Sequence, residues 1–267
     1  MKLGIFDSGL GGLAIARAVR RHIPDIDILY LGDTRHVPYG NRSKETIYTY
    51  TQRCMDYLFR QDCKLVVIAC NTASASALRQ LQQEWLPRHW PDRNILGVIV
   101  PTVEAAIAGG YKKIGLIATH HTVSTGVYAE ELGKIDPAIR LFAQPTPLLV
   151  PLIENDGMKW VDGVLRDYLP PLLAENIECL ILGCTHYACL KDIVRPIVGA
   201  DVAILSQDDI IPARLADYLR RHPEYSDSID RTGKTEFRVS DLTDSYRRAS
   251  VAVYGENITI EKAVIAA

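Results

Sequence analysis

Two cysteines stand at positions where a thiol could do chemistry. Cys70 follows the aliphatic run "KLVVIA" and Cys184 follows "CLILG", and a helical pattern comes after each of them. The positive end of a helix dipole lowers the pKa of a nearby thiol from a reference value of about 8.5. Hydroxyl or amide side chains that could hold a polar ligand also follow both residues. We therefore interpret this pair as candidate functional thiols. The other cysteines are interpreted as packing residues: Cys54, Cys63, Cys179 and Cys189.

Two thiols that face one pocket could invert a stereocentre. One of them removes a proton from one face of a carbon atom beside a carboxylate, and the other returns a proton to the opposite face. A thiol suits this task because its pKa lies near the working pH. Asp7 could assist the thiol on its side, and His186 could assist Cys184. The intermediate carbanion would need hydrogen-bond donors around the carboxylate in a water-poor cleft.

Metal chemistry is disfavoured by the cysteine spacing. The sequence has no C-x-x-C motif, and Cys179, Cys184 and Cys189 are spaced by five. This spacing matches no common zinc pattern. We therefore expect no metal site.

The glycine-rich stretch "GLGGLA", residues 9–14, allows two interpretations. It follows a strand-like run, satisfies G-x-G-x-x-A, and has Asp33 19 residues beyond Ala14, which matches the dinucleotide-binding fingerprint. However, Asp7 and Ser8 stand where the pyrophosphate would approach, and an aspartate repels phosphate. The alternative is a turn whose backbone amides face a smaller anion such as a carboxylate. From the residues alone, a nucleotide-binding module without catalysis stays open beside an enzyme.

Composition limits the classes of partner. The 267-residue chain is 48% hydrophobic and 23% charged, with a formal net charge of −2. With no global positive field, we expect neither nucleic acid nor an anionic membrane surface as a partner. The longest apolar runs are far shorter than the roughly 18 residues of a membrane span, and the N-terminus does not resemble a secretory signal. Six cysteines in an unexported chain favour free thiols and a cytoplasmic location.

Short aliphatic runs alternate with helical patterns along the chain. The runs "KLGIF", "DILYLGD", "KLVVIA", "NILGVIV", "KIGLIAT", "CLILG" and "DVAILS" are continuously apolar. Such runs are typical of strands covered on both faces, so they predict an α/β protein with doubly wound, mainly parallel sheets. Ligands of such sheets bind beyond the carboxyl ends of the strands, where Asp7, Cys70 and Cys184 stand.

A weak internal repeat indicates two similar halves. "LVVIACNTASASALRQL" and "CLILGCTHYACLKDI" share the order of strand, small residue, cysteine, threonine and helix. Pro101 and the Gly109-Gly110 pair are candidate crossing points into the second half. The tail "TEFRVSDLTDSYRRASVAVYG" predicts one strand and one helix that return to the first half.

Four blocks, "GIFDSGLGGL", "GDTRHVPYG", "VIACNTASA" and "LILGCTHY", resemble the signature blocks of the bacterial glutamate racemase family, in the family's order. The similarity extends from residue 3 to about residue 255. Aspartate racemases usually carry a different residue where His186 stands and a histidine where Ser74 stands. The resemblance is therefore to the glutamate branch.

The resemblance implies a cofactor-independent racemase that interconverts L- and D-glutamate and supplies D-glutamate for peptidoglycan synthesis in the cytoplasm. It also implies two pseudo-symmetric α/β domains with the active site in the cleft between them. Residues 1–97 plus 207–267 would form the first domain, and residues 98–206 the second. Members of the family are often dimers, so a homodimer is an expectation that the sequence itself does not reveal.

The resemblance also implies roles for individual positions. Cys70 and Cys184 would be the two acid/base residues, assisted by Asp7 and His186. The substrate pocket would be formed by Ser8, Pro38, Tyr39, Gly40, Asn71, Thr72, Thr119, Thr122 and Thr185. A second enzyme interpretation keeps this mechanism and changes the substrate to aspartate or another small amino acid.

Overall fold

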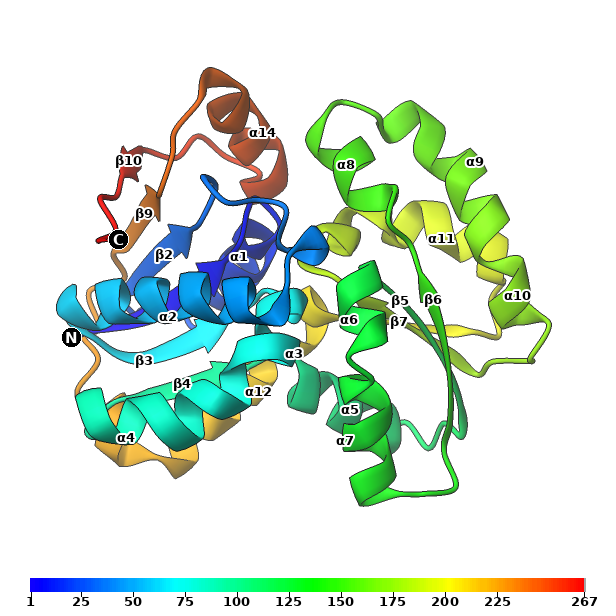
Figure 1. The fold of residues 1–267 in the computed structure, drawn as a ribbon, viewed down its shortest axis with the longest axis horizontal. Helices are drawn as coiled ribbons and strands as arrows, with labels where there is room; N and C mark the ends of the chain where they lie inside the picture. The colour runs from blue at the N-terminus through cyan, green and yellow to red at the C-terminus, as the bar shows by residue number, and fades with distance from the viewer. Residues whose placement is uncertain (267) are drawn as a thin grey trace.

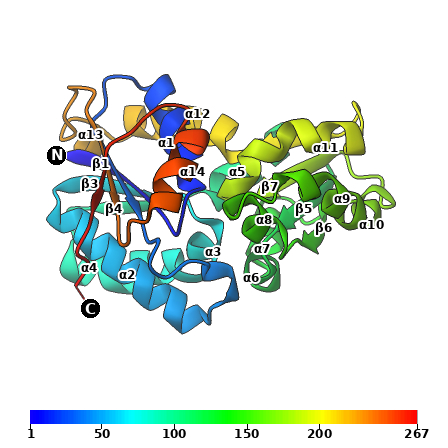
Figure 2. The ribbon, with the colours of Figure 1, turned by 90° about the horizontal axis from the view of Figure 1, so that it is seen from above.

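The strands of the protein form two separate sheets. In the computed structural model, which describes residues 1–266, the strand orders are β10-β9-β2-β1-β3-β4 and β6-β5-β7-β8. Every pairing among these described strands is parallel. Helices pack against each sheet, so that two α/β lobes lie side by side in both views (Figures 1 and 2). The predicted fold class is confirmed.

The bounds of the elements follow the predicted alternation of strands and helices. The first sheet contains β1 (Lys2–Asp7), β2 (Ile28–Gly32), β3 (Cys63–Ile68), β4 (Asn94–Gly97), β9 (Thr235–Val239) and β10 (Ile260–Lys262). The second contains β5 (Lys113–Ala118), β6 (Arg140–Pro145), β7 (Cys179–Gly183) and β8 (Ala203–Ser206). The helices around the first sheet are α1 (Gly12–His22), η1 (Tyr39–Asn41), α2 (Lys44–Arg60), α3 (Asn71–Gln80), η2 (Leu81–Trp85), α4 (Leu86–His89), α12 (Gln207–Arg221), α13 (Pro223–Ser226) and α14 (Asp244–Tyr254). Those around the second are α5 (Ile99–Ala108), α6 (His120–Ser124), α7 (Val127–Ile135), α8 (Leu149–Glu154), α9 (Met158–Tyr168), α10 (Pro170–Leu173), η3 (Thr185–Leu190) and α11 (Lys191–Val198). None of these described helices has the length and hydrophobicity that crossing a bilayer requires.

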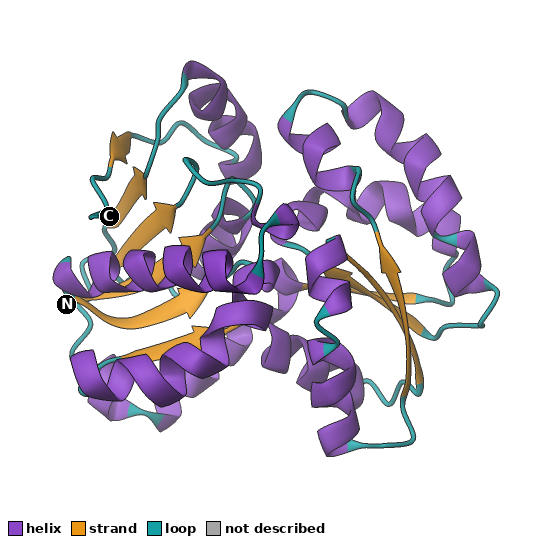
Figure 3. Cartoon of the chain, in the orientation of Figure 1, coloured by secondary structure: helices purple, strands orange, loops and turns teal. Residues whose placement is uncertain are grey.

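Helices cover both faces of each sheet (Figure 3). This arrangement explains the continuous aliphatic runs, because the central strands bury side chains in two directions. In β1, Leu3 and Ile5 pack with residues of α1 and α12, whereas Phe6 packs with residues of α2 and α3. In β7, Leu182 packs with residues of α8 and α9, and Ile181 packs with residues of α5 and α7. Each lobe thus has two hydrophobic clusters, one on each side of its sheet.

The run "NILGVIV" does not form one long strand as predicted. Its strand, β4, ends at Gly97, where its pairing with β3 also ends, and α5 begins at Ile99. Pro101 lies in the first turn of α5, where the missing N–H leaves no hydrogen bond unmade. The chain therefore enters the second lobe earlier than the apolar run indicates.

Strand β6 has no counterpart among the predicted strands. It is an edge strand that pairs only with β5, and its residues are half-buried or exposed. An edge strand with a solvated face lacks the continuous apolar run that marks a central strand.

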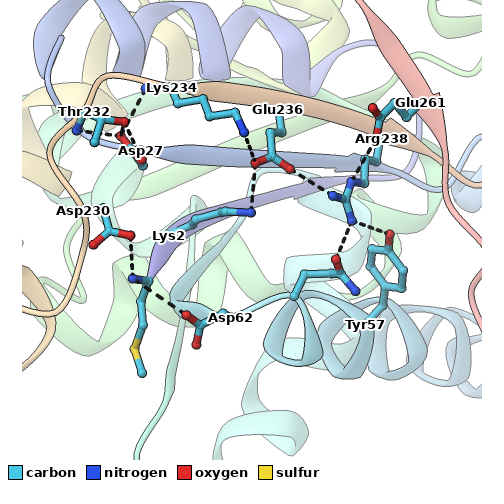
Figure 4. A network of polar contacts seen from close by, with 12 residues as sticks. Lys2, Asp27, Tyr57, Asp62, Asp230, Thr232, Lys234, Glu236, Arg238 and Glu261 are labelled. Atoms are coloured by element: carbon cyan, nitrogen blue, oxygen red, sulfur yellow. Dashed lines mark hydrogen bonds and ion pairs between the residues drawn. The ribbon is translucent and has the colours of Figure 1, made fainter.

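The C-terminal segment returns to the first lobe, as predicted. Strand β9 pairs with β2 in parallel, and α14 packs against α1. Polar contacts near the N-terminus reinforce this return (Figure 4): Lys2 Nζ lies 3.0 Å from Glu236 Oε1, and Asp27 accepts hydrogen bonds from Thr232 and Lys234.

Strands β5 to β8 lie within residues 98–206, and the other strands lie outside this range. On this basis, we propose the division into residues 1–97 plus 207–267 and residues 98–206.

Candidate active site

The carboxyl ends of strands from both sheets converge on one pocket. It is lined from the first lobe by residues after β1, β2 and β3, and from the second by residues after β5, β6 and β7. All of the predicted site residues line it except Asp7 and Thr122, which lie directly behind it. The lining set is Ser8, Pro38, Tyr39, Gly40, Cys70, Asn71, Thr72, Thr119, Cys184, Thr185 and His186.

Cys70 occupies the N-cap position of α3, directly after β3. Its Sγ lies 3.4 Å from Ser8 Oγ and accepts a hydrogen bond from the backbone N–H of Ala73 at 3.5 Å. Only 6% of the residue is exposed. The thiol thus sits at the mouth of a buried strand, between the glycine-rich turn and a helix N-terminus.

The expectation that the pKa of Cys70 is lowered overall is wrong. The pKa of Cys70 is raised to about 12, mainly by burial and further by the negative charge of Asp7, while the hydrogen bonds from Ser8 and Ala73 partly offset the rise. The free-energy cost of removing the thiolate from water exceeds the stabilisation that the helix N-terminus and the two hydrogen-bond donors provide. Burial of the sulfur thus favours the thiol form of Cys70 over the thiolate.

Cys184 lies in a different electrostatic environment. Its Sγ is 3.7 Å from His186 Nδ1, and His186 Nε2 is 2.9 Å from Glu154 Oε1. Burial by itself would lower the pKa of His186, but its contacts with Cys184 and Glu154 outweigh burial and raise this pKa well above its usual range. A charged imidazole therefore lies beside the Cys184 sulfur.

Asp7 ends β1 and is fully buried. Its carboxylate accepts hydrogen bonds from Gly9 N at 3.0 Å and from Thr185 Oγ1, across the interface between the lobes, at 3.2 Å. Burial raises the pKa of Asp7, and the nearby His186 partly offsets this effect. Asp7 therefore acts on Cys70 through its charge and on the second lobe through a hydrogen bond.

The glycines of "GLGGLA" permit contact between the lobes. A Cβ atom on Gly11 would lie 2.3 Å from Thr185 Oγ1 and 2.7 Å from the backbone N of His186. Residues 185–186 thus fill the space beyond the turn where a dinucleotide pyrophosphate would lie. The anion that the turn amides face is a carboxylate of the chain itself, because Gly9 N donates to Asp7. This geometry argues against the nucleotide-binding interpretation.

Three threonine hydroxyls join the lobes on the other side of the pocket. Thr72 Oγ1 lies 3.1 Å from Thr119 Oγ1 and 3.3 Å from Thr122 Oγ1, and the latter two are 3.0 Å apart. Hydroxyl groups both donate and accept, so this cluster can reorient to serve a polar ligand. Thr122 is buried behind the other two.

The "VPYG" loop is held against the pocket by Asp33. The Asp33 carboxylate accepts hydrogen bonds from Tyr39 at 2.7 Å and Ser240 at 2.6 Å. A Cβ atom on Gly40 would lie 3.2 Å from Thr119 Cβ, so this loop also approaches the second lobe closely. Asp33, the acidic residue of the dinucleotide fingerprint, is thus occupied by the protein's own hydroxyl groups.

Several residues of the site carried no predicted role. The partner of His186, Glu154, lies in α8, where the sequence shows no motif. Thr146 follows the unpredicted strand β6. Val37 lies within the recognised block "GDTRHVPYG" and Asn41 directly follows it, so their position was the available signal. The further lining residues are Val37, Asn41, His120, Thr146, Pro147, Val150 and Pro151.

The lining contains no lysine or arginine within residues 1–266. A carboxylate in the pocket would therefore meet hydroxyl groups, amides and the N-terminus of α3. Elsewhere in the described chain, no three His, Cys, Asp or Glu side chains are grouped so that they could hold a metal ion. The six cysteines are free thiols.

Comparisons with known proteins agree with this geometry. The family model described as Asp/Glu/Hydantoin racemase matches residues 13–206. A glutamate racemase of Dinoroseobacter shibae is 38% identical over 237 residues, covering 84% of this chain and 86% of the relative. One from Persephonella marina is 36% identical over 265 residues, covering 98% and 96%.

Solved structures extend the similarity to the whole chain. The glutamate racemase isoform RacE1 from Bacillus anthracis superposes with a TM-score of 0.89 at 29% identity, covering 99% of this chain and 97% of that chain. The glutamate racemase from Francisella tularensis, solved in complex with D-glutamate, superposes with a TM-score of 0.88 at 29% identity and the same coverage.

Replacing Gly11 should open the interface between the lobes. A methyl group in Gly11→Ala meets Thr185 and His186, so we expect alkylation of Cys70 and Cys184 by iodoacetamide to accelerate about tenfold, which corresponds to about 1.4 kcal/mol in the opening equilibrium. Mass spectrometry of the labelled peptides measures each rate. Gly133→Ala is the control, because a Cβ there meets nothing within 4 Å; it should leave these rates unchanged and stabilise α7 by about 0.5–1 kcal/mol. Equal alkylation rates in wild type and Gly11→Ala would contradict the contact.

The raised pKa of Cys70 predicts a specific pH dependence. Below its pKa, the thiolate fraction rises about tenfold per pH unit, so alkylation of Cys70 in the unliganded protein should still increase from pH 7 to pH 10. A free cysteine, with a pKa of about 8.5, levels off above that pH. An alkylation rate of the Cys70 peptide that levels off between pH 9 and pH 10 would show that burial does not dominate this site.

Proposed function

Since the chain belongs to the glutamate racemase family, we propose that it interconverts L- and D-glutamate by moving the α-proton between Cys70 and Cys184. The observation that carries this proposal is that the two thiols line one pocket from opposite lobes. A substrate between them presents one face of its α-carbon to each sulfur. The enzyme is a cofactor-independent isomerase, and the residues at the pocket suffice for the proposed steps.

The proposed reaction conserves protons and charge. The thiolate of one cysteine takes the α-proton and becomes a thiol, which leaves a carbanion whose charge spreads into the α-carboxylate. The thiol of the other cysteine then donates its proton to the opposite face and becomes a thiolate. The reverse reaction exchanges the roles, so each turnover needs one thiol and one thiolate.

The two sulfurs lie in different electrostatic environments. Cys184 is beside His186, whose pKa is raised well above its usual range, whereas the pKa of Cys70 is raised to about 12. We propose that the resting pocket holds a charged His186 beside Cys184 and a Cys70 thiol. When Cys70 must act as the base, the α-ammonium of the bound substrate supplies the positive charge that stabilises its thiolate.

The substrate carboxylates would be held by neutral donors. Ser8, Asn71, Thr72 and Thr185 bring hydroxyl and amide groups to the pocket, and α3 contributes its N-terminus. The remaining proposed binding residues are Pro38, Tyr39, Gly40, Thr119 and Thr122. Donors preorganised around a developing enolate stabilise it more than water does, because the site is buried and does not reorganise.

We further propose that the D-glutamate is made in the cytoplasm for peptidoglycan synthesis. Support comes from the family resemblance and from the six free cysteines, which suit a reducing compartment. A homodimer, which is frequent in this family, stays a prediction.

Isotope incorporation tests the two-thiol mechanism. With L-glutamate in deuterium oxide, the first D-glutamate formed should carry deuterium at the α-carbon, while the remaining L-glutamate stays protiated, because each cysteine serves one face only. Mass spectrometry of the separated enantiomers at low conversion measures both pools. Early deuterium in the L-glutamate pool would indicate a single base and contradict the proposal.

Replacing either cysteine should abolish racemisation. Cys70→Ala and Cys184→Ala each remove one of the two proton-transfer groups, so we expect activity to fall by at least about 10³-fold with the circular dichroism spectrum unchanged. Cys179→Ala, on the same strand that positions Cys184, is the matched control and should keep kcat within about twofold. Racemisation by Cys184→Ala at a normal rate would refute the assignment, and a panel with aspartate tests the alternative substrate.

A further inference from the structure

Three buried polar side chains meet where the two lobes join. Asn71 begins α3, Tyr128 lies in α7 of the second lobe, and Gln207 begins α12. Each exposes at most 2% of its surface. Because a buried amide or hydroxyl without a partner is costly, the hydrogen bonds among these groups determine how each is held.

The three side chains form a closed set of hydrogen bonds. The two amides bond reciprocally: Asn71 Nδ2 donates to Gln207 Oε1 at 2.7 Å, and Gln207 Nε2 donates to Asn71 Oδ1 at 2.8 Å. The Tyr128 hydroxyl donates to Asn71 Oδ1 at 2.7 Å and accepts from Gln207 Nε2 at 3.3 Å. The side chain of Asn71 is therefore fixed by groups from two other helices.

Counting donors and acceptors shows what Asn71 has left to offer. Its Oδ1 accepts two hydrogen bonds, which uses both lone pairs. Its Nδ2 donates one of two hydrogens to Gln207, so the described contacts leave one N–H free. Asn71 also lines the pocket beside Cys70, so this N–H is a donor for a ligand carboxylate.

The set also requires that the lobes be together. Tyr128 belongs to the second lobe, whereas Asn71 belongs to the first. When the lobes separate, Asn71 loses one of the two donors that hold its Oδ1. The same contact that closes the pocket therefore orients the donor.

We propose that Tyr128 and Gln207 are positioning residues for the racemisation: they hold the Asn71 carboxamide with one N–H directed to a substrate carboxylate, and Tyr128 does so only when the lobes are closed. This inference rests on the proposed function for the identity of the carboxylate. Neither residue contacts the reacting atoms, so both act through Asn71.

A double-mutant cycle tests the inference. Tyr128→Phe removes only the hydroxyl, and we expect it to raise KM for both enantiomers about fivefold, the effect of losing roughly one hydrogen bond, while kcat changes less than about twofold. In an Asn71→Ala background, the same substitution should change KM less than about twofold, because the side chain on which it acts is gone. Gln207→Met should behave as Tyr128→Phe does. Equal effects of Tyr128→Phe in both backgrounds, or none in the wild type, would overturn the inference.

A control and a crystal structure separate this inference from the proposed function. Tyr218→Phe removes another tyrosine hydroxyl that an asparagine amide contacts, that of Asn94 at 2.8 Å, and should leave both KM values unchanged. In a crystal structure of Tyr128→Phe, we expect the Asn71 side chain to change rotamer or lose order. An unchanged Asn71 would overturn the inference even if the wild type racemises glutamate, and a wild type without racemase activity would overturn the proposed function alone.

Discussion

The close approach of two backbone segments at Gly11 is the constraint on which the rest of the site depends. A turn at the start of α1 meets the turn after β7 with no room for a side chain between them. This contact places the end of β1 beside the end of β7, and the hydrogen bond from Thr185 to Asp7 seals it. Without such an approach, each lobe would carry one thiol at its own sheet edge, and the two thiols could not share a ligand.

Burial at this contact makes the two thiols chemically unequal. Cys70 has a carboxylate and a hydroxyl as neighbours, and its ionised form is disfavoured. The neighbour of Cys184 is the imidazole of His186, whose other ring nitrogen contacts the Glu154 carboxylate. Both lobes are parallel α/β units, but the charges around the two sulfurs differ. Two proton-transfer groups in unequal surroundings suit a reaction in which one accepts a proton on one face of the substrate and the other donates a proton to the opposite face.

The continuous apolar runs predicted the parallel sheets, because central strands leave a strong local signal, whereas the two halves rested on a weak repeat and the pocket residues on the family resemblance. It missed β6, since an edge strand has a solvated face, and therefore missed Thr146 after it. It missed Glu154 because no local pattern shows that this residue reaches His186. The predicted pKa of Cys70 was wrong because a helix terminus can be read from a sequence, whereas the depth of burial cannot.

The chain passes from one sheet to the other twice, after β4 and again after β8. A single linker would let one lobe swivel freely, but two neighbouring covalent crossings define an axis and restrict the relative motion largely to rotation about it. With this restriction, each closure of the lobes brings the same residues of the two lobes back into contact. The insertion of one half within the other thus makes the two chain crossings a hinge between the lobes.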